Sequence, residues 1–124
     1  MNKVEQARID AMRPWGCVAC ATLGLPNVQH LELHHILDIN SRFGDWHTIF
    51  LCRGHHQGDL WSAEQLELIP EEKRVSLRHG RKLFTLYYPT ERELWERVQQ
   101  KLGLPDTWPP SKVLPRGWRV HTCA

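Results

Sequence analysis

The stretch LCRGHHQG, Leu51 to Gly58, is the most informative part of this sequence. It contains a cysteine, two further residues and then two adjacent histidines. Cys52 and His55 have the C-x-x-H spacing of one half of a tetrahedral zinc site. If a helical turn begins here, His56 points in a different direction from His55, because neighbouring residues of a helix do not share a face. The stretch can therefore supply one ligand to a closed structural site and another to an open site.

The other half of the closed site lies upstream, in the segment WGCVACATLG, where Cys17 and Cys20 form a C-x-x-C pair. Such a pair also occurs at redox sites, but no thioredoxin-like βαβ pattern surrounds this one. Together with Cys52 and His55 it predicts a structural Zn²⁺ site with four ligands, and inert or redox-active thiols are the alternative. Structural zinc contributes on the order of 10 kcal/mol to the folding of small modules, so we expect loss of Cys17 to unfold the region.

Composition limits the class of protein. The 124 residues correspond to one domain, whose modest core would benefit from a structural metal. The net charge of +2 does not by itself identify a nucleic-acid partner. No apolar run is long enough to span a bilayer, and the charged residues 1–13 lead us to expect no secretory leader. Four cysteines without an export signal favour metal binding over disulfides, so we expect a cytoplasmic protein.

The middle of the chain predicts a ββα unit. Residues 30–35 alternate between polar and apolar side chains, which is typical of a strand with one buried face. A loop over residues 38–45 leads to a second strand over residues 47–51, which is rich in residues that favour strands. A short helix follows from about Gly54. The second strand therefore runs directly into the residues of the predicted zinc site.

Helices are expected on both sides of this unit. Residues 3–13 have the pattern of a short amphipathic helix that Pro14 ends. Ser62 can cap a turn of helix that Pro70 stops. The apolar and aromatic residues 82–88 indicate a packed helix.

The clearest helix begins after Thr90, which forms a capping box with Glu93, and ends at the C-cap glycine Gly103. We interpret its apolar stripe as core packing; the stripe comprises Leu94, Trp95, Val98 and Leu102. The predicted fold is α+β, with a small zinc-stabilised domain over residues 1–103. Residues 104–124, rich in proline and tryptophan, are predicted to form an extended C-terminal arm.

Histidines from three parts of the ββα unit can form a second site. Adjacent strand residues point to opposite faces, so His34 and His35 can serve one site only if they have different roles or if the strand is bulged there. We assign His34 and His56 as ligands of a catalytic divalent cation, and His35 as the general base that takes a proton from water. His47, on the second strand, would orient His35 through a carbonyl or ring hydrogen bond. This arrangement suits phosphodiester hydrolysis; the alternative is that these are ordinary surface or core histidines.

As a set, these residues resemble the HNH, or ββα-metal, endonuclease superfamily. The resemblance implies a ββα-metal core and the roles given above. His55 stands where the last zinc cysteine of the family usually stands, and His47 stands where its name-giving asparagine usually stands. The segments that carry the resemblance are Cys17 and Cys20, His34 and His35, His47, and Leu51 through His56.

A narrower resemblance, to the phage Ref family of recombination-enhancing nucleases, extends over most of Trp15 to Val98. It rests on the order C-x-x-C, HHI, TI-x-LC and HH-x-G, followed by SLRHGRKLF (Ser76 to Phe84) and a T-x-x-E-L helix that begins at Thr90. Ref proteins cut DNA bound within a RecA filament. The resemblance therefore implies DNA and a RecA filament on single-stranded DNA as partners, in the cytoplasm of a host bacterium.

Contact with DNA phosphates is expected from basic side chains, and such contacts are sensitive to salt and blind to sequence. The candidates are Arg53, Arg74, Arg78, Arg81 and Lys82. The working ion is expected to be Mg²⁺ or Mn²⁺, although two imidazole ligands also suit Zn²⁺ in a crystal. Two alternatives stay open: a general phage HNH nuclease that does not need RecA, and a zinc-dependent DNA-binding module without catalysis, which would have no use for His35.

Overall fold

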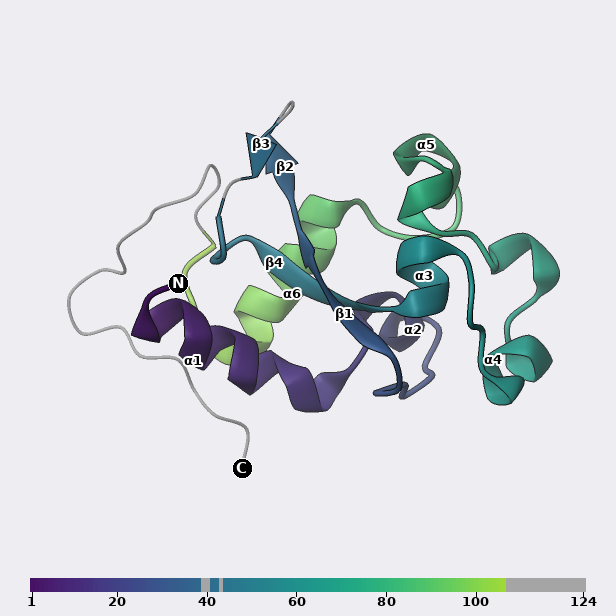
Figure 1. Cartoon of the computed structure of the whole chain (residues 1–124), viewed down its shortest axis with the longest axis horizontal. Coiled ribbons are helices and arrows are strands. Elements are labelled where there is room, and N and C mark those ends of the chain that lie inside the picture. The colour runs from purple at the N-terminus through teal and green to yellow at the C-terminus, as the bar shows by residue number, and fades with distance from the viewer. Residues whose placement is uncertain (39–40, 43, 107–124) are drawn as a thin grey trace.

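A computed structural model describes residues 1–38, 41–42 and 44–106 of the chain. A two-stranded antiparallel hairpin lies at its centre, with helices around it (Figure 1). Strand β1 (Leu31–His35) pairs with β4 (Thr48–Cys52), and Leu33 lies opposite Phe50 in the register. Helix α3 (Arg53–Gln57) follows β4 without a linker. The predicted order of strand, strand and helix and the α+β class are therefore confirmed.

The segment between the two strands is more regular than we predicted. In place of a loop over residues 38–45, strands β2 (Leu37–Asp38) and β3 (Ser41–Arg42) form a short second hairpin. Two-residue strands are too short to produce an alternating pattern of side chains, which explains why the sequence did not indicate them.

The two central strands differ in burial, and this corrects the prediction for the first strand. Every residue of β1 is partly buried, so β1 has no fully buried face. Every residue of β4 is buried, because α2 and α6 pack against it. Alternation in β1 places Leu31 and Leu33 against the core, and Glu32 and His34 on the side that contacts His56.

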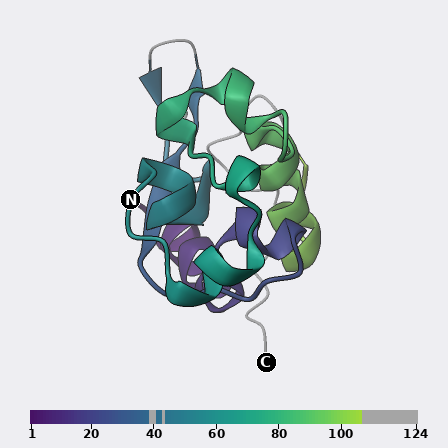
Figure 2. The same cartoon turned by 90° about the vertical axis from the view of Figure 1, so that its right-hand side faces the viewer.

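The remaining elements surround the hairpin, as the view of Figure 2 shows from the side that carries α3, α4 and α5. These elements are α1 (Lys3–Met12), η1 (Arg13–Trp15), α2 (Val18–Thr22), α4 (Ala63–Leu68), η2 (Glu71–Lys73), η3 (Leu77–His79), α5 (Arg81–Phe84) and α6 (Glu91–Leu102).

Among the described residues, no helix has both the length and the apolar composition needed to cross a bilayer.

Helix α6 agrees with its sequence pattern in detail. Thr90 and Glu93 form the capping box, and Gly103 ends the helix in the left-handed conformation with φ 68°. The four residues of the predicted stripe are all buried. The helix packs against β4 and α1, and the Trp95 Nε1–H donates to the carbonyl oxygen of Trp46 at 3.1 Å. Core packing of this helix is therefore confirmed.

The segment 82–88 is less helical than we predicted. Helix α5 is only four residues long. Beyond Phe84 the chain continues in turns, and the backbone N–H groups of Tyr87 and Tyr88 donate to the Phe84 carbonyl oxygen at 3.1 and 3.0 Å. Phe84 and Tyr88 are buried and stacked with ring centroids 4.8 Å apart, whereas Leu86 is 69% exposed. The segment is packed through its two aromatic side chains.

Most of the predicted C-terminal arm, residues 107–124, lies outside the described residues. The division of the chain at residue 104 stays a prediction.

Candidate metal centre and active site

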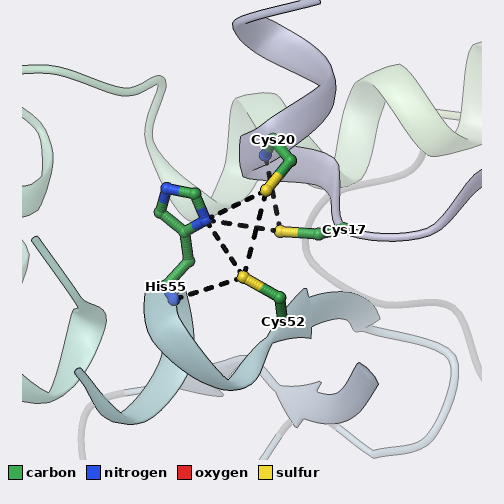
Figure 3. A group of neighbouring side chains, drawn as sticks. All are labelled: Cys17, Cys20, Cys52 and His55. Atoms are coloured by element: carbon green, nitrogen blue, oxygen red, sulfur yellow. Dashed lines mark hydrogen bonds between the residues drawn. The ribbon is translucent and has the colours of Figure 1, made fainter. Parts of the chain in front are cut away.

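Two helix starts bring the predicted structural ligands together (Figure 3). Cys17 is the N-cap of α2, and its Sγ accepts the backbone N–H of Cys20 at 3.4 Å. Cys52 is the N-cap of α3, and its Sγ accepts the backbone N–H of His55 at 3.4 Å. In both pairs the third residue after the cap turns back toward the capping sulfur. The C-x-x-C and C-x-x-H spacings thus become two equivalent knuckles that face each other.

The four side chains have the spacing of a tetrahedral site. The His55 Nδ1 lies 3.6, 3.4 and 3.3 Å from the sulfurs of Cys17, Cys20 and Cys52, and the Cys20 and Cys52 sulfurs are 3.9 Å apart. Tetrahedral zinc with its usual bond lengths needs about 3.6 Å between nitrogen and sulfur and about 3.8 Å between sulfurs. The side chains are at most 1% exposed. This buried Cys₃His group could hold a zinc ion.

A tyrosine fixes the tautomer that a metal would require. The hydroxyl of Tyr88 donates its proton to the carbonyl oxygen of Lys73 at 2.6 Å. It therefore accepts from the His55 Nε2–H, which lies 2.8 Å away. The lone pair of the His55 Nδ1 is left facing the three sulfurs. Sequence analysis missed Tyr88, which lies 33 positions from His55 and belongs to no ligand motif.

A glutamine from α4 covers the sulfurs. The Gln65 Nε2 donates to Cys20 at 3.3 Å and to Cys52 at 3.1 Å. Hydrogen bonds to sulfur favour the ionised thiol. Donation by the Cys17 and Cys20 thiols holds the pKa of Cys52 well below its ordinary range, whereas burial raises the pKa of Cys17. The neighbouring side chains therefore stabilise the thiolate of Cys52 alone. A divalent cation would stabilise the thiolates of all three cysteines.

Beside this closed group, two histidines from different elements face each other. The Nδ1 of His34, on β1, lies 3.2 Å from the Nε2 of His56, on α3. The two rings meet edge to face, with centroids 5.0 Å apart. His55 and His56 are adjacent in α3, yet one faces the sulfurs and the other faces β1. The helical turn after Cys52 therefore separates the two side chains as the sequence predicted.

Each of the facing histidines is held by a carboxylate on its outer nitrogen. The His34 Nε2 lies 2.7 Å from Glu91, and the His56 Nδ1 lies 2.9 Å from Glu32. With both outer N–H groups donated to carboxylates, the inner nitrogens carry lone pairs that repel each other unless a proton or a cation lies between them. This carboxylate–histidine pattern is common at metal sites, and two nitrogens bound to one zinc ion in tetrahedral geometry lie about 3.3 Å apart. The donor set fits a shared divalent cation.

An open cleft of about 270 Å³ runs past the histidine pair. Arg78 and Arg81 line it together with His34, His56 and Glu91. The Arg81 Nε lies 2.6 Å from Glu91. Burial would raise the pKa of Glu91, but the hydrogen bond from His34 and the charge of Arg81 outweigh it, so this pKa lies below its ordinary value. The cleft thus combines an ionised carboxylate, two imidazoles and two guanidinium groups.

His35 turns away from the pair. Glu32 and His34 lie on one side of β1, as their shared contact with His56 shows, and strand alternation places His35 on the other side. There the His35 Nε2 lies 2.8 Å from Asp45. Sequence analysis missed Asp45, because the loop around it carries no motif.

His47 is buried, with its ring stacked on Trp95 at a centroid distance of 4.6 Å. Its carbonyl oxygen accepts the backbone N–H of Ile36 at 3.0 Å. This bond ties the start of β4 to the residue that follows His35.

Three of the basic residues predicted to contact DNA have protein partners, and one of them is Arg81, which pairs with Glu91. Arg53 forms an ion pair with Asp59, its Nε 2.8 Å from the carboxylate, and this hydrogen bond raises the pKa of Arg53. Arg74 donates to the carbonyl oxygens of Ile69 and Leu66 at 3.0 and 3.1 Å, and so closes the C-terminal end of α4. Arg78 and Arg81 line the cleft, and Lys82 is exposed. The structure therefore brings only some of the predicted basic residues to the histidine pair.

Comparison with known proteins gives one family. The model of the family described as recombination enhancement, RecA-dependent nuclease matches residues 2–103, which is most of the chain. The matched range contains all eight residues predicted to bind a metal or to act in catalysis. No curated protein matches the chain.

Proposed function

The chain belongs to the family of recombination-enhancing, RecA-dependent nucleases, and from that premise we propose that it hydrolyses DNA phosphodiester bonds by HNH-type, metal-dependent chemistry. Family membership implies the involvement of DNA and RecA. The single observation that carries the HNH proposal is the pair of imidazoles from β1 and α3, 3.2 Å apart, each with a carboxylate on its outer nitrogen. The order of β1, β4 and α3 supports it.

His34 and His56 would hold a divalent cation, Mg²⁺ or Mn²⁺ in use, through their inner nitrogens. When bound, such an ion offsets the negative charge that develops on the scissile phosphate and the departing 3′ oxygen. Glu91 and Glu32 keep the outer nitrogens protonated and so keep the inner lone pairs available. Arg78 and Arg81, in the same cleft, provide the positive charge that attracts the DNA backbone.

His35 is proposed as the general base. Asp45 accepts the Nε2–H of His35, which leaves the Nδ1 lone pair free to take a proton from water. His34 and His35 lie on opposite sides of β1. One phosphate group can therefore contact both imidazoles only if it lies beside the edge of that strand. Among the described residues β1 pairs on one edge alone, with β4. His47 acts in this proposal as a positioning residue, because its carbonyl oxygen accepts the backbone N–H of Ile36, the residue that follows His35.

The Cys₃His group has a supporting role in this proposal. A zinc ion there would join the starts of α2 and α3. Since His56 follows His55 directly, a fixed α3 also fixes the direction of His56 toward β1. The structural site therefore keeps the catalytic imidazoles at their separation.

The proposal is tested by cutting assays with the purified protein, on single-stranded DNA and on duplex DNA paired with a RecA filament, in Mg²⁺ or Mn²⁺. We expect cutting in the presence of the RecA filament, and a loss of about a hundredfold or more in His35→Ala, because a positioned general base contributes about that much. His30→Asn is the matched control: His30 is exposed and has φ 52°, a conformation that asparagine tolerates.

Two results would overturn parts of this account. If no DNA is cut with or without RecA, the hydrolytic function is wrong. If His35→Ala cuts as fast as His30→Asn, another group is the base. Equal cutting of free and RecA-bound DNA would favour a nuclease that works without the recombinase.

A further inference from the structure

A second hollow lies directly beside the catalytic cleft. Its volume is about 260 Å³, and it shares Leu37, Leu77, Arg81 and Glu91 with the cleft. The ion pair between Arg81 and Glu91, 2.6 Å long, is therefore part of the wall that both hollows have in common. A ligand that lies against the histidine pair can extend into the second hollow without leaving the protein surface.

The chemistry of the second hollow differs from that of the cleft. Ile36 and Phe84, both buried, form apolar parts of its lining. The hydroxyl of Thr85 donates to the carbonyl oxygen of Arg81 at 2.9 Å, and the hydroxyl of Thr90 donates to Glu93 at 3.0 Å. Because both protons are used within the protein, the two oxygens can only accept from a ligand. Arg92 and the shared pair of Arg81 and Glu91 complete the lining. A mainly apolar hollow with a few polar groups is typical of a site for a small ring-shaped ligand.

We propose that this hollow, lined by Ile36, Leu37, Leu77, Phe84, Thr85 and Thr90, receives the unstacked nucleobase of the nucleotide next to the scissile phosphate. The inference rests on the proposed function, because it places the phosphate in the adjoining cleft. The phosphate and the base of a nucleotide lie side by side, as the two hollows do. The amino or imino N–H groups of a base would donate to the threonine oxygens.

The hollow is continuous with the catalytic cleft. For this reason we choose a nucleobase as its occupant, rather than an apolar side chain of a protein partner. A base that enters the hollow must leave its stack, and this costs least when the strand is already single-stranded or locally unpaired. The hollow therefore favours substrates whose cut strand is open at the scissile position.

Thr85→Phe is the variant that fills the hollow. Thr85 is exposed, so the larger side chain need not disturb the core. Leu86→Phe is the matched control, since it places the same ring one position later on a residue that is 69% exposed and does not line the hollow.

The first measurement does not depend on cutting. The ¹⁵N-labelled protein is titrated with deoxyadenosine monophosphate and with deoxyribose 5-phosphate, and the amide shifts of Leu37 and Thr85 are followed. We expect the nucleotide to bind about tenfold more tightly than the sugar phosphate, because contact with a base contributes about that much. The difference should persist in Leu86→Phe and disappear in Thr85→Phe. Equal affinities in the wild type, or an unchanged difference in Thr85→Phe, would overturn the proposal.

The second measurement uses cutting. Oligonucleotides with a single abasic residue at successive positions are cut by the wild type, Thr85→Phe and Leu86→Phe. An abasic residue at one position next to the cut should lower the cutting rate of the wild type and of Leu86→Phe about tenfold. Thr85→Phe should cut every substrate slowly, and the abasic residue at that position should not lower its rate further. Base-dependent binding without any cutting would refute the nuclease chemistry and keep the hollow as a base site. Cutting without base dependence in either measurement would refute the hollow and keep the nuclease.

Discussion

The closed Cys₃His group and the open histidine pair both depend on α3, and they differ in how completely the protein fills them. In the closed group, the four ligand side chains are at most 1% exposed and surround one point. In the open pair, His34 and His56 are 16% and 20% exposed and border a cleft. A helix turns about 100° per residue, so adjacent residues can serve both. We infer that the closed group stabilises the fold and that the open pair carries the chemistry.

The largest expected effect is on the closed group. Cys17→Ser should abolish cooperative unfolding, because a structural zinc contributes on the order of 10 kcal/mol, comparable with the whole stability of a small domain. Far-UV circular dichroism during heating checks this, with zinc content measured on the same sample. His34→Ala, which removes an imidazole from the open pair only, should keep its unfolding transition. A Cys17→Ser protein that melts like the wild type would show that the Cys₃His group has no structural role.

A smaller effect on stability and a large one on activity are expected from His56→Ala. The fold should survive, since His56 is partly exposed and lies outside the Cys₃His group. DNA cutting should fall by about a hundredfold or more, because one of the two proposed ligands of the catalytic ion is lost. Cutting rates and melting curves together check this. An unfolded variant would contradict the separation of roles between His55 and His56.

An intermediate effect is expected from Glu91→Gln, which keeps the size of the side chain and removes its charge. Loss of a carboxylate behind a metal-bound histidine costs about tenfold to a hundredfold in metal affinity or activity. The Mn²⁺ concentration that gives half-maximal cutting should rise accordingly, while Thr90 and Glu93 still cap α6. Glu96→Gln, on the same helix, is the control. No change in Mn²⁺ dependence would show that Glu91 is only a structural partner of Arg81.

The smallest expected effect is from Gln65→Leu. The substitution removes two N–H donors from the sulfurs of Cys20 and Cys52 but leaves all four ligands. Hydrogen bonds to charged groups contribute about 2 kcal/mol, so the free energy of unfolding should fall by about that amount and the Cys₃His group should release zinc faster to a chelator. Glu64→Leu, exposed in the same helix, should do neither.

The sequence predicted those parts of the structure that depend on local spacing. The two knuckles around Cys17 and Cys52 and the capping box of α6 all involve residues three positions apart. Such spacings fix the positions of the side chains through the first turn of a helix, so the sequence alone is enough to locate these features.

The partners that the sequence did not predict come from distant segments. Glu91 lies 57 positions from His34, and Gln65 lies 45 positions from Cys20. Their contacts exist because α6 and α4 pack in particular orientations, which no local pattern encodes. The same holds for the hollow beside the cleft, whose lining spans residues 36–92.

The claim that His55 and His56 bind two different metal ions is tested most directly by counting the metal ions bound per chain. Elemental analysis, combined with calorimetric titration by Mn²⁺ or Zn²⁺, should find two sites in the wild type: one zinc that is retained on purification and one weaker ion. His56→Ala should lose the weaker ion and keep the zinc. A wild-type chain that binds one ion in total, or a His56→Ala chain that still binds two, would contradict the account.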